Sequence, residues 1–261
     1  MIRVPNSDLH THTDYSDGRG NLTENVRAAE AAGLDAIAIA DHLMPAGYEK
    51  HADRDALVAR AAEVRQAQCW ADTRVIMAVE ATVLDPQGTL SAEPADLEGV
   101  ELTLVDVSWL TAGLAHSVPA SRQTQVANAL QVYLQLALEA AVDVLAHPFT
   151  LGRFGLDITL EDLPRAGLVE LGHALAETGT AFEINNGVWW WWPQCYPRQL
   201  ADEYAAVVAA VAEGGAKFTL GSDAHCNTGV GNLGWAKRVA EVAGLGEASW
   251  ADVEGMLARR Q

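Results

Sequence analysis

Short apolar segments alternate with helical segments along nearly the whole chain, and this alternation is the strongest constraint on the fold. Near the N-terminus, residues 2–12, 22–32 and 35–40 read as a strand, a helix and a second strand. Such a unit requires a parallel pair, because only a crossover connection brings the second strand back alongside the first. Because the unit then repeats, the sequence predicts an α/β protein built on a parallel sheet.

The later elements continue the same order. Further strands are expected at 74–80, 101–108, 143–146, 181–184 and 217–220, and further helices at 53–70, 123–141, 168–178, 199–214, 235–242 and 249–260. Polar side chains follow at least five of these seven strands. A barrel fits this pattern better than an open sheet, because the strand ends of a barrel converge on one rim, whereas an open sheet gathers ligands mainly at one switch point. We therefore expect a barrel of βα units, formed as a single domain over residues 1–261.

Composition limits the partners of this domain. The 261 residues carry 35 acidic and 17 basic side chains, and the net charge of -18 argues against binding to long nucleic acid. The three cysteines, Cys69, Cys195 and Cys226, form no C-x-x-C pair, which indicates a reduced, intracellular chain. No leader and no apolar run of roughly 18 residues is present, so we expect a cytoplasmic protein without a membrane partner.

Two i,i+2 pairs of metal-binding residue types lie at opposite ends of the chain. His10 and His12 share one face of the first strand, because side chains alternate between the faces of extended segments. Asp223 and His225 repeat this spacing directly after the last strand. One such pair is a weak signal, whereas two at strand ends favour a common metal site.

The other strand ends extend this set. The residues gathered there are His10, His12, Asp41, His42, Glu80, His116, His147, Glu183, Asn185, Asn186, Asp223 and His225. Imidazole and carboxylate ligands together suit zinc, manganese or iron. Taken alone, His147 would fit equally well as a hydrogen-bonded core histidine, and Glu80 as the cap of a neighbouring element. Asp41 is interpreted as a partner that orients a histidine, and His51 and His173 are assigned no chemical role.

The chain resembles the PHP (polymerase and histidinol phosphatase) family of metal-dependent phosphoesterases over nearly its whole length. The segments that carry the resemblance are DLHTHTDYSDG, AAGLDAIAIADH, AVEATVLDPQG, LAHP, TGTAFEINN and GSDAH, in this order. The middle of the chain is most similar to the PHP domains of bacterial X-family DNA polymerases and their stand-alone relatives. The resemblance implies a distorted seven-stranded (β/α)7 TIM-like barrel, in agreement with the seven strands expected from the apolar pattern.

The resemblance also implies two or three divalent metal ions, of zinc, manganese or iron. His10, His12, Glu80 and Asp223 would hold the first, Glu80 would bridge to a second held by His116 and His147, and Asp17, His42 and His225 would hold a third. The segment VDVSWLTAGLAH departs from the short valine-glycine-serine approach usual before the histidine at the position of His116. This departure leaves the second site open.

The catalytic set follows from the same resemblance. Glu80 and Asp223 would lie at the reacting centre, where a metal-activated hydroxide attacks phosphorus. Arg153, after His147-Pro148, and Arg19, after the first strand, lie in the loops from which a cation could clamp phosphoryl oxygens. The alternative for each is an ordinary solvated arginine.

The run Val188-Trp189-Trp190-Trp191-Trp192-Pro193 is not explained by the resemblance. It follows the strand at 181–184, so these rings would either wall the pocket and stack on a substrate or pack over the barrel and against a neighbouring subunit.

The function predicted from these observations is metal-dependent hydrolysis of a small phosphomonoester or nucleotide. The alternatives are a histidinol-phosphate phosphatase, a hydrolase of a non-phosphate ester, and a non-catalytic metal-binding PHP module. The expected partner is a small phosphorylated substrate, and the sequence does not indicate an oligomeric state.

Overall fold

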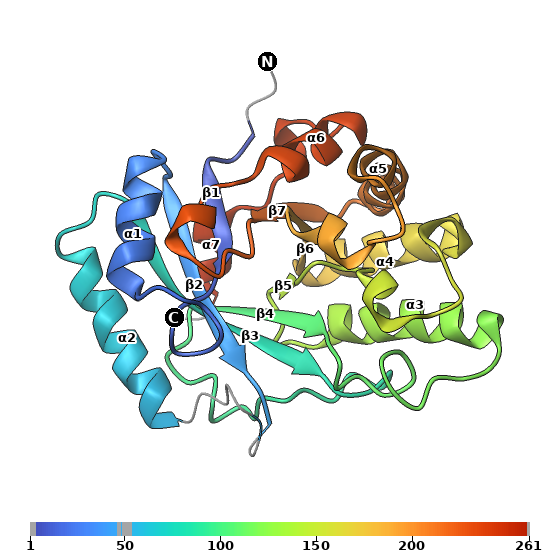
Figure 1. The fold of residues 1–261 in the computed structure, drawn as a ribbon, viewed down its shortest axis with the longest axis horizontal. Coiled ribbons are helices and arrows are strands. Elements are labelled where there is room, and N and C mark those ends of the chain that lie inside the picture. Colours follow the sequence, from blue (N-terminus) through green and yellow to red (C-terminus); the bar gives the residue numbers. More distant parts are fainter. Residues whose placement is uncertain (1–3, 46–47, 49–53, 260–261) are drawn as a thin grey trace.

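Seven parallel strands form a nearly closed barrel in the computed structural model, which describes residues 4–45, 48 and 54–259. The strands are β1 (Ser7–Thr11), β2 (Ala36–Leu43), β3 (Arg74–Val83), β4 (Leu102–Val107), β5 (Val144–Leu145), β6 (Ala181–Asn185) and β7 (Lys217–Gly221). Their spatial order follows the chain order, and each strand pairs with the next in parallel (Figure 1). The predicted fold class is therefore confirmed.

The barrel closes where the two ends of the sheet meet. Thr11 forms a parallel bridge with Ala224, just after β7, and the His12 backbone N–H donates to the Ala224 carbonyl at 2.9 Å. In the same seam the Asp223 N–H donates to the His10 carbonyl at 2.9 Å. These bonds place the residues that follow β1 and β7 side by side, although more than two hundred residues separate them in the sequence.

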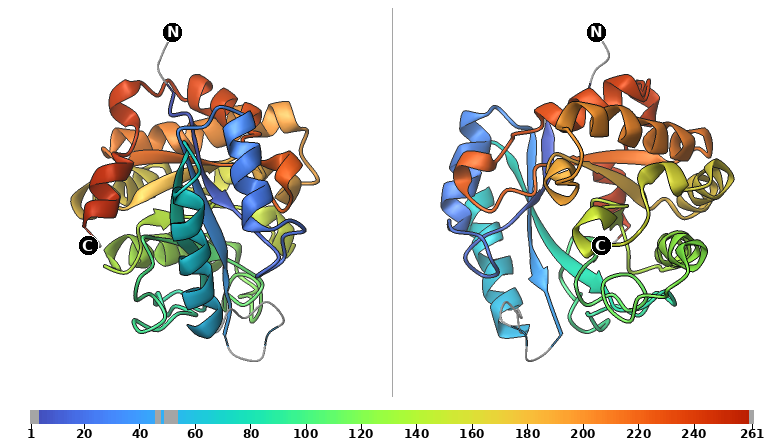
Figure 2. Two further views of the ribbon diagram at one scale, coloured as in Figure 1. Left: turned by 90° about the vertical axis from the view of Figure 1, so that its left-hand side faces the viewer. Right: turned by 45° about the vertical axis from the view of Figure 1, so that its right-hand side comes forward.

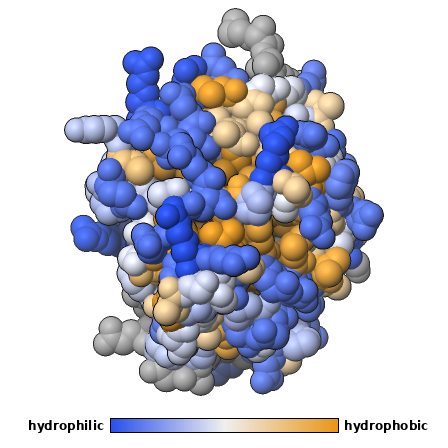
Figure 3. All heavy atoms as spheres, turned by 90° about the vertical axis from the view of Figure 1, so that its right-hand side faces the viewer, coloured by the Kyte–Doolittle hydropathy of each residue, from blue (hydrophilic) through white to orange (hydrophobic). Residues whose placement is uncertain are grey.

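Helices cover the outside of the barrel, as the sequence predicts. They are α1 (Leu22–Ala31), α2 (Arg54–Gln68), α3 (Arg122–Leu138), α4 (Arg165–Thr178), α5 (Pro197–Glu213), α6 (Gly234–Val242) and α7 (Val253–Ala258). The views in Figure 2 show α1 and α2 together on one side of the sheet and α3 to α6 around the other. On the side of α3 to α5, hydrophobic side chains are exposed among hydrophilic ones (Figure 3). Among the described helices, none has the length and apolar character needed to cross a membrane.

Most predicted boundaries differ from the structure by a few residues, and two differences have clear causes. Strand β3 continues past Glu80 to Val83, because β4 pairs with it as far as Val83 and β2 as far as Ala81. The last helix begins only at Val253, because the Ala251 N–H donates to Phe218 and holds the preceding segment extended. The expected start of the first strand and of the helix at 53–70 reaches residues that lie outside the described ranges.

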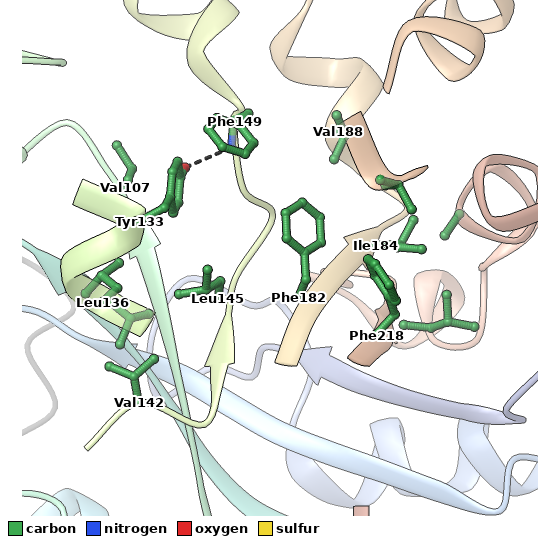
Figure 4. Packing of buried hydrophobic residues seen from close by; sticks show 14 of the residues in the cluster. Val107, Tyr133, Leu136, Val142, Leu145, Phe149, Phe182, Ile184, Val188 and Phe218 are labelled. Carbon is green, nitrogen blue, oxygen red and sulfur yellow. Dashed lines mark hydrogen bonds between the residues drawn. The ribbon is translucent and has the colours of Figure 1, made fainter. Parts of the chain in front are cut away.

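Two hydrophobic clusters lie on the two sides of the sheet. The larger one fills the space between strands and helices, where Tyr133, Phe149, Phe182 and Phe218 pack together (Figure 4). The smaller one lies inside the barrel and includes Met256 and Leu257 of α7, which pack against residues at the beginnings of the strands. Helix α7 thus closes the end of the barrel where the strands begin. The opposite end, where the strands finish, carries the polar residues.

Helices α4 and α5 approach each other at glycines. A methyl group on Gly172 would overlap the Val211 carbonyl oxygen, and one on Gly214 would overlap the Val169 carbonyl oxygen. We expect Gly172→Ala to lower the free energy of unfolding by about 1–3 kcal/mol, the usual cost of overpacking a close contact. Chemical denaturation would measure this change. Gly234→Ala is the matched control, because no atom lies within 4 Å of its added methyl group; equal losses in both variants would contradict the role given to Gly172.

Candidate metal centre

Alternation along the strands determines which side chains reach the inner mouth of the barrel. The inward residues of three neighbouring strands are Ala38, Ala40 and His42 of β2, Ile76, Ala78 and Glu80 of β3, and Leu102, Leu104 and Asp106 of β4. In each strand two apolar residues fill the barrel and the third, nearest the carboxyl end, is polar. Because side chains alternate with a period of two, the inward residues form hydrophobic layers in the barrel and one polar layer at its carboxyl end.

Strand β1 adds two histidines to this layer through an irregularity. Its pairing with β2 shifts register between Asp8 and Thr11, so that Leu9 joins the barrel interior and His10 and His12 still point inward. The Nε2 atoms of the two fully buried histidines lie 3.1 Å apart. Two lone-pair donors at this separation can bind one ion together.

Glu80 occupies the middle of the cluster and is 1 % exposed. Its Oε2 lies 3.2 Å from His10 Nε2, 3.5 Å from His12 Nε2 and 3.0 Å from His42 Nδ1. Its Oε1 lies 2.8 Å from His147 Nε2. Burial alone would raise the pKa of Glu80, but the surrounding histidines, His10 foremost, hold it well below its usual value. The carboxylate is therefore ionised and reaches four imidazoles with its two oxygens.

Asp223 closes one side of this cluster. Its Oδ1 lies 3.0 Å from His12 Nε2 and 3.7 Å from His10 Nε2. Burial raises the pKa of Asp223, but the two histidines outweigh it and lower that pKa below its ordinary value. The residue has a φ of 56°, a left-handed conformation that is uncommon outside glycine.

Asp17 gathers a second group of histidines nearer the solvent. Its Oδ2 lies 3.1 Å from His225 Nε2, and its Oδ1 lies 3.6 Å from His42 Nε2. Burial lowers the pKa of both imidazoles, but Glu80 acting on His42 and Asp17 acting on His225 raise each pKa to about 9. In the metal-free protein both imidazoles are therefore protonated at neutral pH.

The donor atoms of these residues form three groups in which every atom lies within 4.8 Å of the others. The groups are His12, Asp17, His42 and His225; His10, His12 and Asp223; and His10, Glu80 and His147. Among the described residues, Glu80 Oε2, His12 Nδ1 and His42 Nδ1 are buried without a hydrogen-bond partner, although charged neighbours surround them. Unsatisfied buried donors and acceptors are costly unless an ion completes them. The donor set, imidazole nitrogen and carboxylate oxygen, fits zinc, manganese or iron.

His147 is held in place through its backbone. His147 and Phe149 both have positive φ, at 31° and 63°. The Phe149 N–H donates to the buried Tyr133 hydroxyl at 2.8 Å (Figure 4), and the Tyr204 hydroxyl donates to the Pro148 carbonyl at 2.8 Å. These bonds stabilise a turn that non-glycine residues rarely adopt, and the turn aims the imidazole at Glu80.

His116, predicted as a ligand, is not brought to this cluster. It is exposed, its Nε2 lies 2.9 Å from the Leu110 carbonyl oxygen, and it belongs to none of the three groups. The physical reason is the turn at 111–116, where backbone bonds from Ala115 and His116 to Thr111 fold the segment back on itself. Of the two other histidines, His173 is exposed on α4, and His51 lies outside the described residues.

Two further carboxylates support the cluster: Glu183, which the sequence places at a strand end without a ligand role, and Asp106, which the sequence analysis did not single out. Glu183 accepts from His10 Nδ1 at 2.9 Å and from the His147 backbone N–H at 2.7 Å, so His10 presents Nε2 to the centre. Asp106 accepts from the Thr82 hydroxyl at 2.6 Å, and burial raises the pKa of Asp106. Alternation from Leu102 and Leu104 was the signal that could have identified Asp106.

Asp41 supports the loop after β1. It accepts hydrogen bonds from the Thr13 N–H at 2.7 Å and the Ser16 hydroxyl at 2.8 Å, and Arg60 lies 3.1 Å away. Through these bonds Asp41 holds Thr13 and Ser16, in the loop segment that leads to Asp17.

The two predicted arginines differ in position. Arg153 is 13 % exposed, donates from Nη2 to the Val107 carbonyl and lies 3.6 Å from Asp106 Oδ2. Arg19 is exposed, and its backbone N–H donates to the His225 carbonyl at 2.8 Å. Arg153 thus lies inside the mouth of the barrel, whereas Arg19 lies at its edge.

The tryptophan run divides between the site and the outer core. The Trp191 ring lies 4.5 Å from the His147 ring and 4.8 Å from the Arg153 guanidinium carbon, measured between centres. Trp192 is buried, Trp189 packs against the outer core, and Trp190 is 68 % exposed. One of the four rings, Trp191, therefore borders the metal centre.

Known proteins share this architecture. A probable phosphatase of Thermoanaerobacter sp. is 25% identical over 246 residues, which is 92% of this chain and 87% of that protein. The zinc complex of histidinol phosphate phosphatase from Lactococcus lactis with L-histidinol and phosphate superposes with a TM-score of 0.66 at 15% identity, over 94% of each chain. A putative histidinol phosphatase from Listeria monocytogenes superposes with a TM-score of 0.64 at 14% identity, over 86% of this chain and 97% of that one.

The family model of the PHP domain matches residues 8–222, which include the first histidine pair, Glu80 and the last strand. With this match and the barrel described above, the chain belongs to the PHP domain family.

Proposed function

We propose that this protein is a metal-dependent phosphoesterase that hydrolyses a small phosphomonoester. The observation that carries the proposal is the position of Glu80, a buried ionised carboxylate within 3.5 Å of imidazole nitrogens from four histidines. A carboxylate so placed is suited to bridge metal ions. The similarity to probable phosphatases over most of the chain supports the same activity.

The residues that would hold ions fall into the groups already described. His10, His12, Asp223 and Glu80 would hold one ion and Asp17, His42 and His225 another, while Glu80 and His147 leave two donor atoms at a third position beside them. Bound divalent cations would supply an acidified water and neutralise phosphoryl oxygens. The protein would orient His10 through Glu183 and His147 through its constrained turn. Arg153 would offer guanidinium donors to the phosphoryl group, with Arg19 at the edge of the mouth.

The substrate class follows from charge and access. The net charge of -18 disfavours long polyanions, while Arg153, 13 % exposed beside Asp106, would offer one small phosphoryl group a cationic partner. Trp191 gives the mouth one aromatic wall. Three free cysteines, of which Cys69 is exposed, support a reducing compartment such as the cytoplasm.

Histidinol-phosphate hydrolysis is a second candidate, favoured by the structural similarity to the Lactococcus lactis enzyme. Phosphate release from histidinol phosphate, nucleoside monophosphates and simple alkyl and aryl phosphates, measured with zinc, manganese and iron, would separate the candidates. Release from none of them under any metal would contradict the phosphoesterase proposal and favour a non-catalytic metal-binding module. Ester cleavage that inorganic phosphate does not inhibit would indicate a non-phosphate ester instead.

Glu80→Gln is expected to remove metal and activity together. The amide keeps the shape of the side chain but loses the charge, and the expected fall in activity exceeds about 100-fold, because loss of a partner behind a ligand already costs 10–100-fold. Elemental analysis and phosphate release would be measured on the same preparation. Glu213→Gln, which breaks an exposed ion pair with Arg165, is the matched control. Full metal content and full activity in Glu80→Gln would contradict the bridging role.

Metal affinity is expected to rise with pH up to about 9. His42 and His225 each have a pKa raised to about 9 in the metal-free protein, so an incoming ion must displace their protons. The ionised carboxylates add no such dependence in this range. Calorimetric titration of the metal-free protein at pH 6.5, 7.5 and 8.5, in buffers of different ionisation enthalpy, would give affinity and protons released. An affinity that does not change with pH would contradict the assignment of these two histidines as ligands.

A further inference from the structure

We infer that the centre binds two metal ions and that the Arg153 guanidinium provides the positive charge at the third position, beside Glu80 and His147. This inference rests on the proposed function, because it concerns how the same centre binds a phosphoryl group. The number of donor atoms available at each position supports the inference.

The first ion has a complete set of ligands. His10 has only Nε2 to offer, because its Nδ1 bonds to Glu183 at 2.9 Å. That Nε2 lies 3.1 Å from His12 Nε2, and the His12 atom lies 3.0 Å from Asp223 Oδ1. His10 therefore belongs with His12 and Asp223, and it cannot also serve an ion beside His147.

The second ion also has a complete set. His225 bonds to the Asp223 carbonyl through Nδ1 at 2.9 Å, which leaves its Nε2 facing Asp17 at 3.1 Å. His42 Nε2 completes the group at 3.6 Å from Asp17 Oδ1. Three side chains from three different segments thus converge on one position.

The third position retains only two donors. Once His10 is assigned to the first ion, Glu80 Oε1 and His147 Nε2, 2.8 Å apart, remain. His116, expected to supply another nitrogen, is turned away and exposed. Catalytic zinc sites usually have three protein ligands, so two donors make a weak site.

Asp106 does not make up the deficit. One of its oxygens accepts from the Thr82 hydroxyl at 2.6 Å, and the other lies 3.6 Å from Arg153 Nη2. It is absent from every group of converging donor atoms among the described residues. Asp106 therefore positions Arg153 instead of binding an ion.

Arg153 brings a permanent positive charge to this side of the centre. Its guanidinium carbon lies 4.9 Å from the centre of the Phe154 ring and 4.8 Å from that of the Trp191 ring, and the Trp191 ring in turn lies 4.5 Å from the His147 ring. Within the described part of the chain, its Nε–H is buried without a hydrogen-bond partner. A planar guanidinium with an unused donor can bind phosphoryl oxygens that a metal ion would otherwise bind.

Metal counting tests the inference without reference to activity. Metal-free protein would be titrated with zinc and with manganese, and tightly bound ions per chain would be counted by calorimetry and by elemental analysis after desalting. We expect two ions in the unaltered protein, two in His147→Gln, two in Asp106→Asn and one in His225→Gln. Circular dichroism would verify that each variant is folded, and Asp106→Asn keeps the test decisive if His147→Gln does not fold.

Phosphate binding tests the role of Arg153. We expect Arg153→Ala to keep two ions but to bind inorganic phosphate about tenfold or more weakly, and Arg153→Lys to give an intermediate value because it keeps the charge and loses the planar fork. Arg122→Ala is the matched control, since Arg122 is 51 % exposed and paired with Asp162. Unchanged phosphate affinity in Arg153→Ala would overturn the role of Arg153.

The outcomes separate the two proposals. Three tightly bound ions in the unaltered protein would overturn the inference and leave the phosphoesterase proposal standing. Two ions that fall to one in His147→Gln or Asp106→Asn would also overturn it, because those residues would then be ligands. No bound ion would overturn the inference and the proposed function together.

Discussion

The ionised carboxylate of Glu80, buried in the mouth of the barrel, is the feature on which the rest of the centre depends. Burying a single unpaired charge is energetically unfavourable. Here histidines of the β1 segment, of β2 and of the turn after β5 surround the carboxylate and offset this cost. The carboxylates in turn favour the protonated form of two histidines of the centre, because they raise the pKa of His42 and of His225. The metal-free cluster is thus a network of mutually stabilising charges whose geometry is suited to cations.

The barrel makes this network possible because it separates two chemical environments within single strands. Residues such as Ile76 and Ala78 fill the interior below, and Glu80, two residues further on, enters the polar layer. Support from behind is equally specific, since Glu183 orients His10 and two tyrosine hydroxyls hold the turn of His147. The centre therefore depends on side chains that are not themselves in its groups of converging donor atoms.

Much of this architecture could be predicted from the sequence, because both periods, two for strands and about 3.6 for helices, are clear in the apolar residues. The apolar pattern predicted the number of strands and their parallel order. The strand-end pattern and the resemblance together predicted that Asp17, His42, Glu80 and Asp223 converge. The position of His116 did not, because hydrogen bonds within the turn at 111–116 decide it, and no periodicity encodes them. Asp106 is a different case, because its strand was predicted. Alternation from Leu102 and Leu104, which face the barrel interior, would also have placed the Asp106 side chain inside.

The seam between β1 and the segment after β7 links the centre to the closure of the barrel. His12 and Asp223 meet only when the first and last strands are joined, so the ion-binding geometry exists only in the closed barrel. An ion that binds only the closed barrel would stabilise the folded state by mass action and would act at this junction. The metals would then join the first and last strands of the barrel, in addition to activating water for hydrolysis.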